Sequence, residues 1–259
     1  MKRITAAIIT FNEERNIERC IKGLIGCVDE IVVLDSFSTD RTKDICHQYD
    51  VRFIQKEWEG YAKTKNTLND IIDSEYIFSI DSDEVPDSIL KEEINRIKED
   101  DSNGIYVLNR RTNYCGKWIK YCGWYPEYKN RIFPNGMASW KGDYVHEFLS
   151  FDSSIKLHRL KGHLEHYSYY SYSEHKARAN KYALLSAKQY FNEKRSVFWL
   201  QAEISASLKF LIIYIIKRGF LDGISGFQIA WISAVSNRLK YKELKKLYAN
   251  HHLDNTKNE

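Results

Sequence analysis

The stretch Glu75-Tyr-Ile-Phe-Ser-Ile-Asp81-Ser-Asp83-Glu84 runs from apolar residues directly into an acidic cluster. Apolar and β-branched residues fill almost every position of residues 76–80, which predicts a strand buried on both faces of a parallel sheet. Asp81 and Asp83 follow at the carboxyl end of this strand. Side chains two positions apart leave an extended segment on the same side, so the two carboxylates are expected to converge. Open α/β sheets bind their ligands at this edge.

Two converging carboxylates suit a hard divalent cation, Mg²⁺ or Mn²⁺, which takes oxygen ligands and is often shared with substrate phosphates. A calcium loop does not fit, because it needs an oxygen ligand and a glycine where Val85 and Pro86 stand. A glycosidase pair would normally come from separated segments. The remaining alternative is a solvated turn in which Asp83 or Asp87 caps the next helix.

Length and composition bound the class of protein. The 259 residues can form one large domain or one domain with an appendage. Charged residues make up 29% and apolar residues 43%, as in ordinary globular proteins, and the net charge of +4 is too small to indicate nucleic-acid binding. The first apolar run is too short for a signal sequence, and the five cysteines form no C-x-x-C pair, so we expect reduced thiols in the cytoplasm.

The first hundred residues alternate strands with helices. Strands are predicted at Ile4–Thr10, Glu30–Asp35, residues 51–55 and residues 76–80, and helices from about Glu13, over residues 41–49 and 60–74, and from Pro86. Such βαβ units predict an α/β fold with a mostly parallel sheet flanked by helices. Neither G-x-G-x-x-G nor G-x-x-x-x-G-K-S/T is present, which argues against dinucleotide and P-loop chemistry.

Polar residues close the first two predicted strands. Thr10, Asn12 and Glu13 follow the first strand, and Asp35 and Ser36 follow the second. An acid at a strand tip can accept a hydrogen bond from a ribose hydroxyl or a base N–H. The alternative for Asp35 is a turn residue that caps the next helix, and Asn12 stands in a sequence typical of helix caps.

These residues together carry a resemblance to a known family. The segments that match are Ile8-Ile-Thr-Phe-Asn-Glu-Glu, Val33-Leu-Asp-Ser-Phe-Ser-Thr-Asp-Arg-Thr, Gly60-Tyr-Ala-Lys-Thr-Lys-Asn, Ser79-Ile-Asp-Ser-Asp-Glu, Gly116-Lys-Trp-Ile, Gly123-Trp-Tyr-Pro-Glu, Asn130-Arg-Ile-Phe and Val145-His-Glu. In this order they resemble the inverting glycosyltransferases of family 2, which have the Rossmann-like GT-A fold. The branch that they resemble includes lipopolysaccharide-core β-glucosyltransferases, and the resemblance covers about residues 3–167.

The resemblance implies roles for the acids and bases at the strand ends. The side chains that would hold the uridine of a UDP-sugar are Thr10, Asn12, Glu13 and Asp35. Lys65 matches the basic position that faces the diphosphate, although Lys63 is near enough to compete and an exposed lysine is the alternative. Asp83 would coordinate the metal, and Asp81, also in the D-x-D motif, would assist or contact ribose. A metal and a lysine would neutralise the charge on the departing UDP.

An inverting transfer also needs a general base for the acceptor hydroxyl. The best-known family members show a Glu-Asp pair at that point, and no such pair occurs after residue 101. Glu147 is favoured because it follows a glycine- and aromatic-rich loop, and Glu127 remains a competitor for base or acceptor contact. His163 and His166 are expected to be structural rather than metal ligands.

Residues 104–145 are rich in aromatic and basic side chains. Aromatic rings with polar handles suit sugars, although buried aromatic residues of a sheet give the same pattern. The basic residues fit either a phosphorylated acceptor or a solvated face, and they are Arg110, Arg111, Lys117, Lys120, Lys129 and Arg131.

Helices are predicted from Tyr172 onward, over residues 175–194, 197–217 and 226–239. The apolar run 210–216 is too short to span a bilayer. Basic residues flank the apolar faces, which is typical of helices on an anionic membrane surface, and packing on the catalytic domain or in a homodimer is the alternative.

The predicted organisation has three parts. A catalytic domain covers residues 1–170, with a nucleotide-sugar-binding half at 1–101 and an acceptor half at 102–170. A membrane- or subunit-associating helical region covers 171–253, and a disordered tail covers 254–259.

The expected function is metal-dependent, inverting transfer of a hexose, with glucose favoured, from UDP to a lipopolysaccharide-core-like or other membrane-associated glycan acceptor. The enzyme is expected at the inner face of the cell membrane. The alternatives are a transferase to polyprenyl phosphate and a non-catalytic nucleotide-sugar-binding scaffold.

Overall fold

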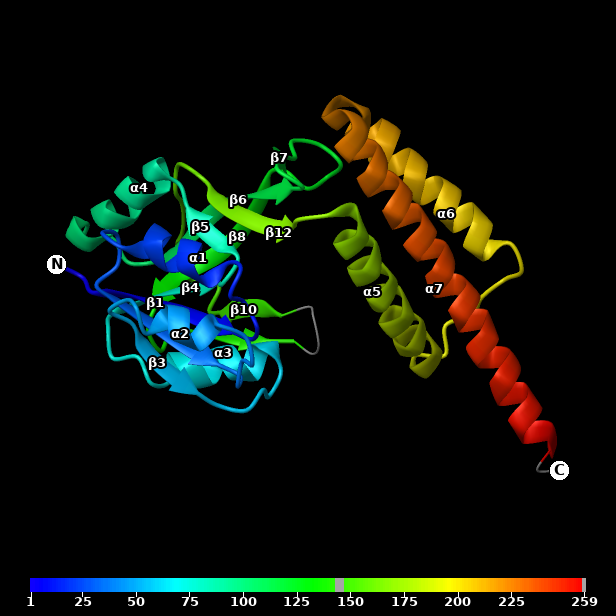
Figure 1. Ribbon diagram of the computed structural model, residues 1–259, viewed down its shortest axis with the longest axis horizontal. Coiled ribbons are helices and arrows are strands. Elements are labelled where there is room, and N and C mark those ends of the chain that lie inside the picture. The colour runs from blue at the N-terminus through cyan, green and yellow to red at the C-terminus, as the bar shows by residue number, and fades with distance from the viewer. Residues whose placement is uncertain (143–146, 258–259) are drawn as a thin grey trace. The chain divides into compact units, whose positions relative to one another are not determined.

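A computed structural model describes residues 1–142 and 147–257, with side chains described through residue 251 outside the first gap. The chain forms two compact units. Unit 1 is Met1–Arg111 with Pro126–Tyr167, and unit 2 is Thr112–Tyr125 with Ser168–Glu259. Unit 1 contains most of the α/β sheet and unit 2 contains the long C-terminal helices (Figure 1). The segment 112–125, assigned from sequence to the acceptor half, groups with the helices.

Four parallel strands form one half of the sheet in unit 1. They are β1 (Ile4–Thr10), β2 (Glu30–Asp35), β3 (Arg52–Gln55) and β4 (Tyr76–Asp81), in the order β3-β2-β1-β4. In β4, Phe78 and Ile80 pack in one core cluster and Ile77 in the other, because successive side chains of a strand alternate. Both faces of β4 are therefore buried, which explains its continuous apolar sequence and confirms the predicted α/β class.

Beyond β4 the sheet continues with antiparallel pairing. The further strands are β5 (Glu84–Pro86), β6 (Ile105–Tyr114), β7 (Lys117–Trp118), β8 (Glu127–Pro134), β11 (Leu157–Arg159) and β12 (Leu164–Tyr169). The order from β4 is β4-β8-β6-β12-β5, and β7 and β11 also pair with β6. This arrangement brings β5, which directly follows Asp81 and Asp83, into the same sheet as the later strands.

Helices and a hairpin cover the two faces of the sheet in unit 1. The helices α1 (Ile17–Leu24), α2 (Thr42–Cys46) and α4 (Ser88–Glu99) contribute buried residues to one core cluster. The helix α3 (Tyr61–Asn69) and the hairpin of β9 (Ala138–Lys141) and β10 (Phe148–Phe151) contribute to the other. Figure 1 shows α1 and α4 on the opposite side of the strands from α3.

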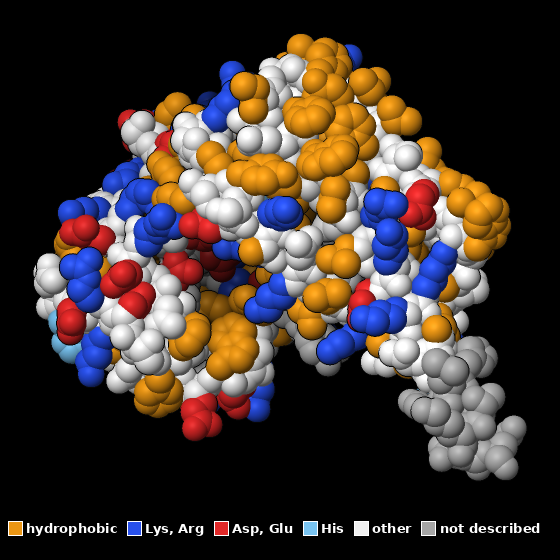
Figure 2. Space-filling view, turned by 45° about the vertical axis from the view of Figure 1, so that its right-hand side comes forward, with side chains coloured by type: hydrophobic (Ala, Val, Ile, Leu, Met, Phe, Trp, Pro, Cys, Tyr) orange, Lys and Arg blue, Asp and Glu red, His pale blue; other side chains and the backbone are white. Residues whose placement is uncertain are grey.

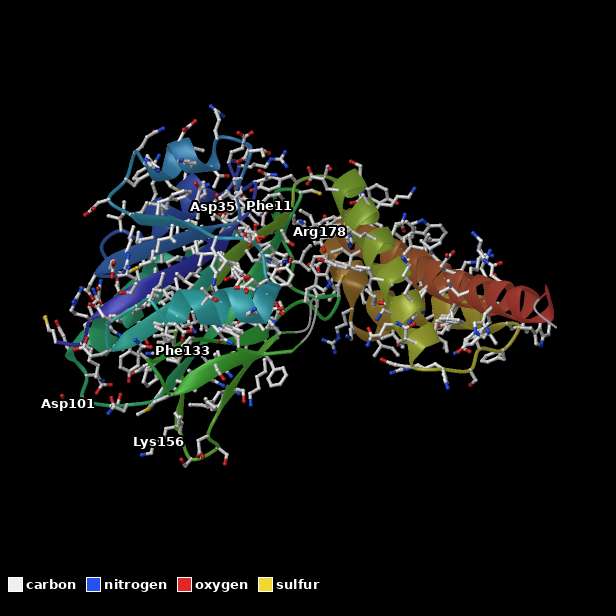
Figure 3. The ribbon with its side chains drawn as sticks, turned by 90° about the horizontal axis from the view of Figure 1, so that it is seen from below. Phe11, Asp35, Asp101, Phe133, Lys156 and Arg178 are labelled. Atoms are coloured by element: carbon white, nitrogen blue, oxygen red, sulfur yellow. The ribbon has the colours of Figure 1, made fainter. Side chains whose placement is uncertain are left out.

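The register of the parallel strands sets their carboxyl ends at one edge. Thr10 pairs with Asp35 across β1 and β2, and Ile9 pairs with Asp81 across β1 and β4. Figure 3 shows Asp35 beside Phe11 at this edge, with Asp101 and Lys156 at the opposite end of unit 1. The acids singled out from the sequence therefore lie at neighbouring strand ends.

The helix limits differ from those predicted. The helix α1 begins at Ile17 rather than near Glu13, since Glu13 instead accepts backbone hydrogen bonds in a turn before it. Both α2 and α3 are shorter than the predicted 41–49 and 60–74. Pro86 does not open α4. It lies in β5, paired with Leu164, and Asp87 caps the helix by accepting from the backbone N–H of Leu90 at 2.9 Å.

Unit 2 is built from three long helices, as the sequence predicts. They are α5 (Tyr172–Asn192), α6 (Gln201–Leu211) and α7 (Gly223–Lys257), with the short helical turns η1 (Ile212–Ile216) and η2 (Gly219–Asp222) between the last two. The helix α7 continues well beyond the predicted end at residue 239, and Leu244 in this extension is buried. Across residues 1–142 and 147–257, no helix combines the length and apolar character needed to cross a membrane.

The buried centre of β4 gives a test of the fold. Phe78 is fully buried, so Phe78→Ala should lower the free energy of unfolding by about 3–5 kcal/mol through lost apolar burial and a cavity. Ile89, whose side chain is exposed, provides the matched control, and Ile89→Ala should change stability by much less. Urea unfolding monitored by circular dichroism measures both, and equal effects of the two substitutions would contradict this core.

Candidate active site

A buried lysine and a buried arginine hold Asp81 at the tip of β4. Lys65 Nζ of α3 lies 2.9 Å from Asp81 Oδ1, and the guanidinium of Arg131 on β8 donates to Asp81 Oδ2. Both basic side chains are only 4% exposed. Burial raises the pKa of Asp81, but the positive charges of Arg131 and Lys65 outweigh it and hold that pKa well below its usual range. Asp81 is therefore an anion already neutralised by protein groups.

The same arginine extends the pairing into a network that includes two further strands. Arg131 also donates to Glu84 on β5 at 2.7 Å, and Glu84 is fully buried. Glu84 accepts in addition from Arg110 on β6 at 2.9 Å and from the backbone N–H of Asp81 at 3.1 Å. Arg110 in turn makes two hydrogen bonds to Glu127 on β8, at 2.8 and 2.9 Å. Each buried charge thus has an opposite partner, as burial requires.

Lys65 also links the strand tip to Glu147. Its Nζ lies 3.4 Å from Glu147 Oε1 and 4.5 Å from the ring centroid of Trp140. Lys63, the competing lysine, is largely exposed and forms an ion pair with Glu59. The side chain that faces the acids is therefore Lys65.

Glu127 and Glu147 have different surroundings. Burial raises the pKa of Glu127, but the hydrogen bonds and charge of Arg110, aided by Lys129 at 2.9 Å, lower it to about 2. A carboxylate held in this way is a weak base. Glu147 has a single described ion-pair contact, to Lys65 at the outer limit of hydrogen-bond length. Val145 and His146, which precede it in the matching motif, lie outside the described residues.

Asp83 faces a histidine that sequence reasoning set aside. Asp83 Oδ2 lies 3.2 Å from His166 Nε2 on β12, and both side chains are partly buried. His163, by contrast, contacts the helix-capping Asp87 at 3.0 Å. Burial raises the pKa of Asp83 and the neighbouring His166 lowers it, with a net shift downward. The structure thus separates the D-x-D acids: Asp81 is neutralised by Lys65 and Arg131, and Asp83 lies beside an imidazole.

Asp83 and His166 fit a divalent cation that shares its coordination with a substrate. Among the side chains described, those of residues 1–142 and 147–251, no cluster of three or more histidine, cysteine or acidic side chains forms a metal site. Mg²⁺ usually binds through one or two carboxylates together with substrate phosphates and water, so two protein ligands suffice for this kind of site. An imidazole beside a carboxylate is also a donor set compatible with Mn²⁺.

Two buried hydroxyl groups at the strand tips have no partner among the described residues. They are Thr10 Oγ1, at the end of β1, and Ser36 Oγ, directly after β2. Buried polar atoms are normally hydrogen-bonded, so unpaired ones at a ligand-binding edge indicate groups that a ligand can satisfy. Both atoms lie beside Asp35, which is fully buried.

Asp35, Asn12 and Glu13 are engaged with neighbouring loops. Asp35 accepts from the backbone N–H and hydroxyl of Ser38 and from Gln55 Nε2. Asn12 has a left-handed backbone (φ 54°) and accepts from the backbone N–H of Thr39 at 2.8 Å. Glu13 accepts from the side-chain amide of Asn16 at 2.7 Å. These bonds fix the two loops that follow β1 and β2, and the predicted uridine contacts of the three residues stay predictions.

A family model described as glycosyl transferase family 2 matches residues 5–154, more than half of the chain. The chain belongs to glycosyltransferase family 2. The matched range contains all the residues predicted from sequence to form the site, from Thr10 to Glu147. The GT-A fold and the family inferred from the sequence are therefore confirmed.

Relatives of this glycosyltransferase match over almost its whole length. A chain of Rickettsia bellii described as an uncharacterized glycosyltransferase is 28% identical over 256 residues, covering 95% of this chain and 87% of its own. The lipopolysaccharide core biosynthesis glycosyltransferase LpsC of Rhizobium meliloti is 28% identical over 263 residues, covering 96% and 93%. Among solved structures, S. aureus TarS 1–349 in complex with UDP-GlcNAc is similar with a TM-score of 0.47 at 15% identity, covering 90% of this chain and 79% of that one.

Four charged or titratable residues of the site were missed or misread from the sequence. The sequence places Arg110 and Arg131 in a basic patch that is solvated or faces the acceptor, yet both are paired inside unit 1. Glu84 directly follows the D-x-D motif. Nothing in the sequence distinguishes it from the motif acids as the partner of Arg131 and Arg110. For His166 the only signal was its place in a strand, which the sequence could not pair with β5.

The buried network predicts a large effect of removing one charge. Arg131→Met leaves Asp81 without one of its two partners and Glu84 paired only with Arg110, so the free energy of unfolding should fall by about 3–5 kcal/mol. Lys129→Met removes an exposed partner of Glu127 and should cost about 1 kcal/mol or less. Chemical denaturation measures both, and an Arg131→Met protein as stable as Lys129→Met would show that the network is not buried.

The low pKa of Glu127 predicts a pH-dependent stability. Glu127 titrates at about 2 when folded and near its ordinary 4.5 when unfolded, so its ion pair stabilises the folded chain above about pH 4.5 and less as the pH falls toward 2. The stability difference between wild type and Glu127→Gln should be constant above about pH 5 and shrink below it. Urea titrations at successive pH values measure this difference, and a value that stays constant in acid would contradict the pairing.

Proposed function

We propose that this family-2 enzyme transfers a hexose, with inversion, from a UDP-sugar to a membrane-associated glycan acceptor. The observation that carries the proposal is the buried Lys65, which contacts both Asp81 at the strand tip and Glu147. Lys65 holds Glu147 only at 3.4 Å, and a cation beside a loosely held carboxylate is what an inverting transfer needs, because the cation stabilises the leaving group and the carboxylate takes a proton. The similarity to LpsC supports an acceptor of the lipopolysaccharide-core kind, and glucose is the proposed sugar.

In this proposal the strand tips bind the donor. The unpaired hydroxyls of Thr10 and Ser36 and the acid of Asp35 lie where uridine would bind, with Asn12 and Glu13 shaping the adjoining loop. Asp83 and His166 would hold Mg²⁺ or Mn²⁺, which when bound supplies positive charge to the diphosphate. Lys65 adds a fixed positive charge beside Asp81, at a position that needs no rearrangement as UDP departs.

Glu147 is the proposed base. The acceptor hydroxyl attacks the anomeric carbon, the bond from that carbon to the diphosphate oxygen breaks, and the hydroxyl proton passes to Glu147. Glu127 is less suited, since its pKa of about 2 and its two hydrogen bonds to Arg110 make it a poor proton acceptor. We assign Glu127 instead to holding Arg110 in the network.

All the proposed donor, metal and base residues lie in unit 1. Unit 2 then serves to bring unit 1 to its acceptor. We propose that the enzyme works at the inner face of the cell membrane, where unit 2 provides the contact with the membrane.

Asp83→Ala tests the donor and metal site. Wild type should be stabilised against heat by UDP with Mn²⁺ more than by UDP alone, since a ligand that binds only the folded state raises its stability. Asp83→Ala should lose the Mn²⁺-dependent part of this shift, and Asp73→Ala, which alters an exposed acid, should keep it. Thermal unfolding monitored by fluorescence gives the shifts, and an unchanged Mn²⁺ effect in Asp83→Ala would argue against the assignment.

Glu147→Gln tests the chemistry. Loss of a general base should lower kcat by about 100- to 10,000-fold while UDP stabilisation persists. The exposed Glu57 provides the control, and Glu57→Gln should keep full activity. Transfer from UDP-glucose to isolated lipopolysaccharide core measures the rates. A second assay uses polyprenyl phosphate as acceptor. Full activity of both Glu147→Gln and Glu127→Gln with that acceptor, and none with lipopolysaccharide core, would favour the polyprenyl-phosphate transferase. A wild type unable to hydrolyse any UDP-sugar would favour a scaffold.

A further inference from the structure

Unit 2 carries a dense group of exposed apolar side chains where α6 passes into α7. We define the apolar tip as Ile215, Ile216, Phe220, Leu221, Ile224 and Phe227. Ile216 is 72% exposed and Ile224 79%, and the other four are each about half exposed. Figure 2 shows hydrophobic side chains gathered over this end of unit 2, at the top of the view. Soluble proteins rarely expose so many large apolar residues together unless the surface binds something.

The backbone of the apolar tip is an ordered turn. Arg218 has a left-handed backbone (φ 52°), and the backbone N–H groups of Lys217 and Leu221 donate to Ile212 and Arg218. Gly219 and Gly226 pack so closely that a Cβ on Gly226 would lie 1.8 Å from the Gly219 carbonyl oxygen. The turn therefore presents the apolar side chains before and after it on one fixed surface.

Positive charges surround the apolar tip. Lys217 and Arg218 lie between Ile216 and Phe220 in the sequence, and both side chains are exposed. Lys117 and Lys120 come from the neighbouring loop, which is held against the turn because Lys117 Nζ donates to the Asp222 carbonyl at 2.7 Å and Cys122 N–H donates to the Lys217 carbonyl at 3.1 Å. The four cations thus belong to the same surface as the apolar residues.

The segments that form this surface, residues 112–125 and 204–242, contain no exposed acid. Residues 204–242 contain a single acid, Asp222. Asp222 is buried, and its carboxylate accepts from the backbone N–H groups of Lys120 and Tyr121 at 3.2 and 2.8 Å. The negative charge of Asp222 is therefore satisfied by hydrogen bonds inside unit 2. On these two segments an anionic partner would meet lysine and arginine without an opposing carboxylate.

We infer that the apolar tip docks on the surface of an anionic lipid bilayer, with Ile216 and Ile224 entering the boundary of the acyl chains and the four cations contacting lipid headgroups. Apolar side chains surrounded by lysine and arginine are the pattern of interfacial membrane contact. A second copy of this chain is a poorer occupant, because a symmetric contact through the tip would bring the same cations together.

The inference deepens the proposed function, since it identifies which surface of unit 2 meets the membrane that carries the acceptor. The structure also limits how deeply the apolar tip enters the bilayer. The apolar segment around η1 is short, so the tip lies in the interface and does not cross the bilayer.

Vesicle binding by the full chain tests the inference. Wild type should sediment with vesicles of phosphatidylethanolamine and phosphatidylglycerol, and binding to phosphatidylcholine vesicles should be much weaker. Ile216→Ser combined with Ile224→Ser should lower the vesicle partition coefficient by about tenfold or more. Lys217→Gln combined with Arg218→Gln should lower it for anionic vesicles and leave residual binding to phosphatidylcholine unchanged.

The matched control makes the same kind of double substitution, apolar to serine, in unit 1. Ile89→Ser combined with Met137→Ser alters two exposed apolar residues of unit 1 and should keep full vesicle binding. Light scattering without lipid follows the oligomeric state. A wild type that ignores anionic vesicles, an Ile216→Ser/Ile224→Ser protein that binds as well as wild type, or a dimer that this double substitution dissociates would each overturn the inference.

Failure of the membrane-docking inference can be distinguished from failure of the proposed transferase function. Stabilisation by UDP with Mn²⁺ depends on unit 1 and should be the same in wild type and in the tip variants. Vesicle binding without any UDP effect would uphold the docking surface while the proposed function fails, and the reverse result would overturn the docking surface alone.

Discussion

The pairing of buried charges around Asp81 is the constraint on which the site depends. Desolvating a carboxylate is costly. Asp81 at the tip of β4 and Glu84 on β5 are tolerated because Lys65, Arg131 and Arg110 neutralise them. These bonds connect α3 with the strands β4, β5, β6 and β8, which come from distant parts of the sequence. The carboxyl edge of the sheet is thereby held in one arrangement before any substrate binds, and such preorganisation is what electrostatic catalysis requires.

The network also divides the acids of the site by environment. Asp81, Glu84 and Glu127 are committed to basic partners, whereas Asp83 lies beside His166 and Glu147 makes only a long contact with Lys65. The residues left to act on a substrate are therefore the ones at the margin of the network. This separation is the physical reason for preferring Glu147 to Glu127 as base, although both are glutamates at the same edge.

Much of this could be predicted from the sequence, because it depends on local periodicity. The strands β1, β2 and β4 follow from uninterrupted apolar segments, and the position of Asp81 and Asp83 follows from the end of β4. Long-range pairing is what the sequence did not reveal. Pro86 suggested a helix start, but its pairing with Leu164 places it in β5, and that same pairing brings His166 to Asp83. Arg110 and Arg131 alternate with apolar residues in strands, and only the tertiary structure shows that they face the acids inside unit 1.

The account is tested most directly by a crystal structure of the protein with UDP and Mn²⁺, using anomalous scattering to locate the metal. We predict a manganese peak within about 2–2.5 Å of a carboxylate oxygen of Asp83, with the diphosphate beside Lys65 and the uridine against Thr10 and Asp35. A nucleotide bound elsewhere, with Asp83 and Lys65 both remote from it, would contradict the account.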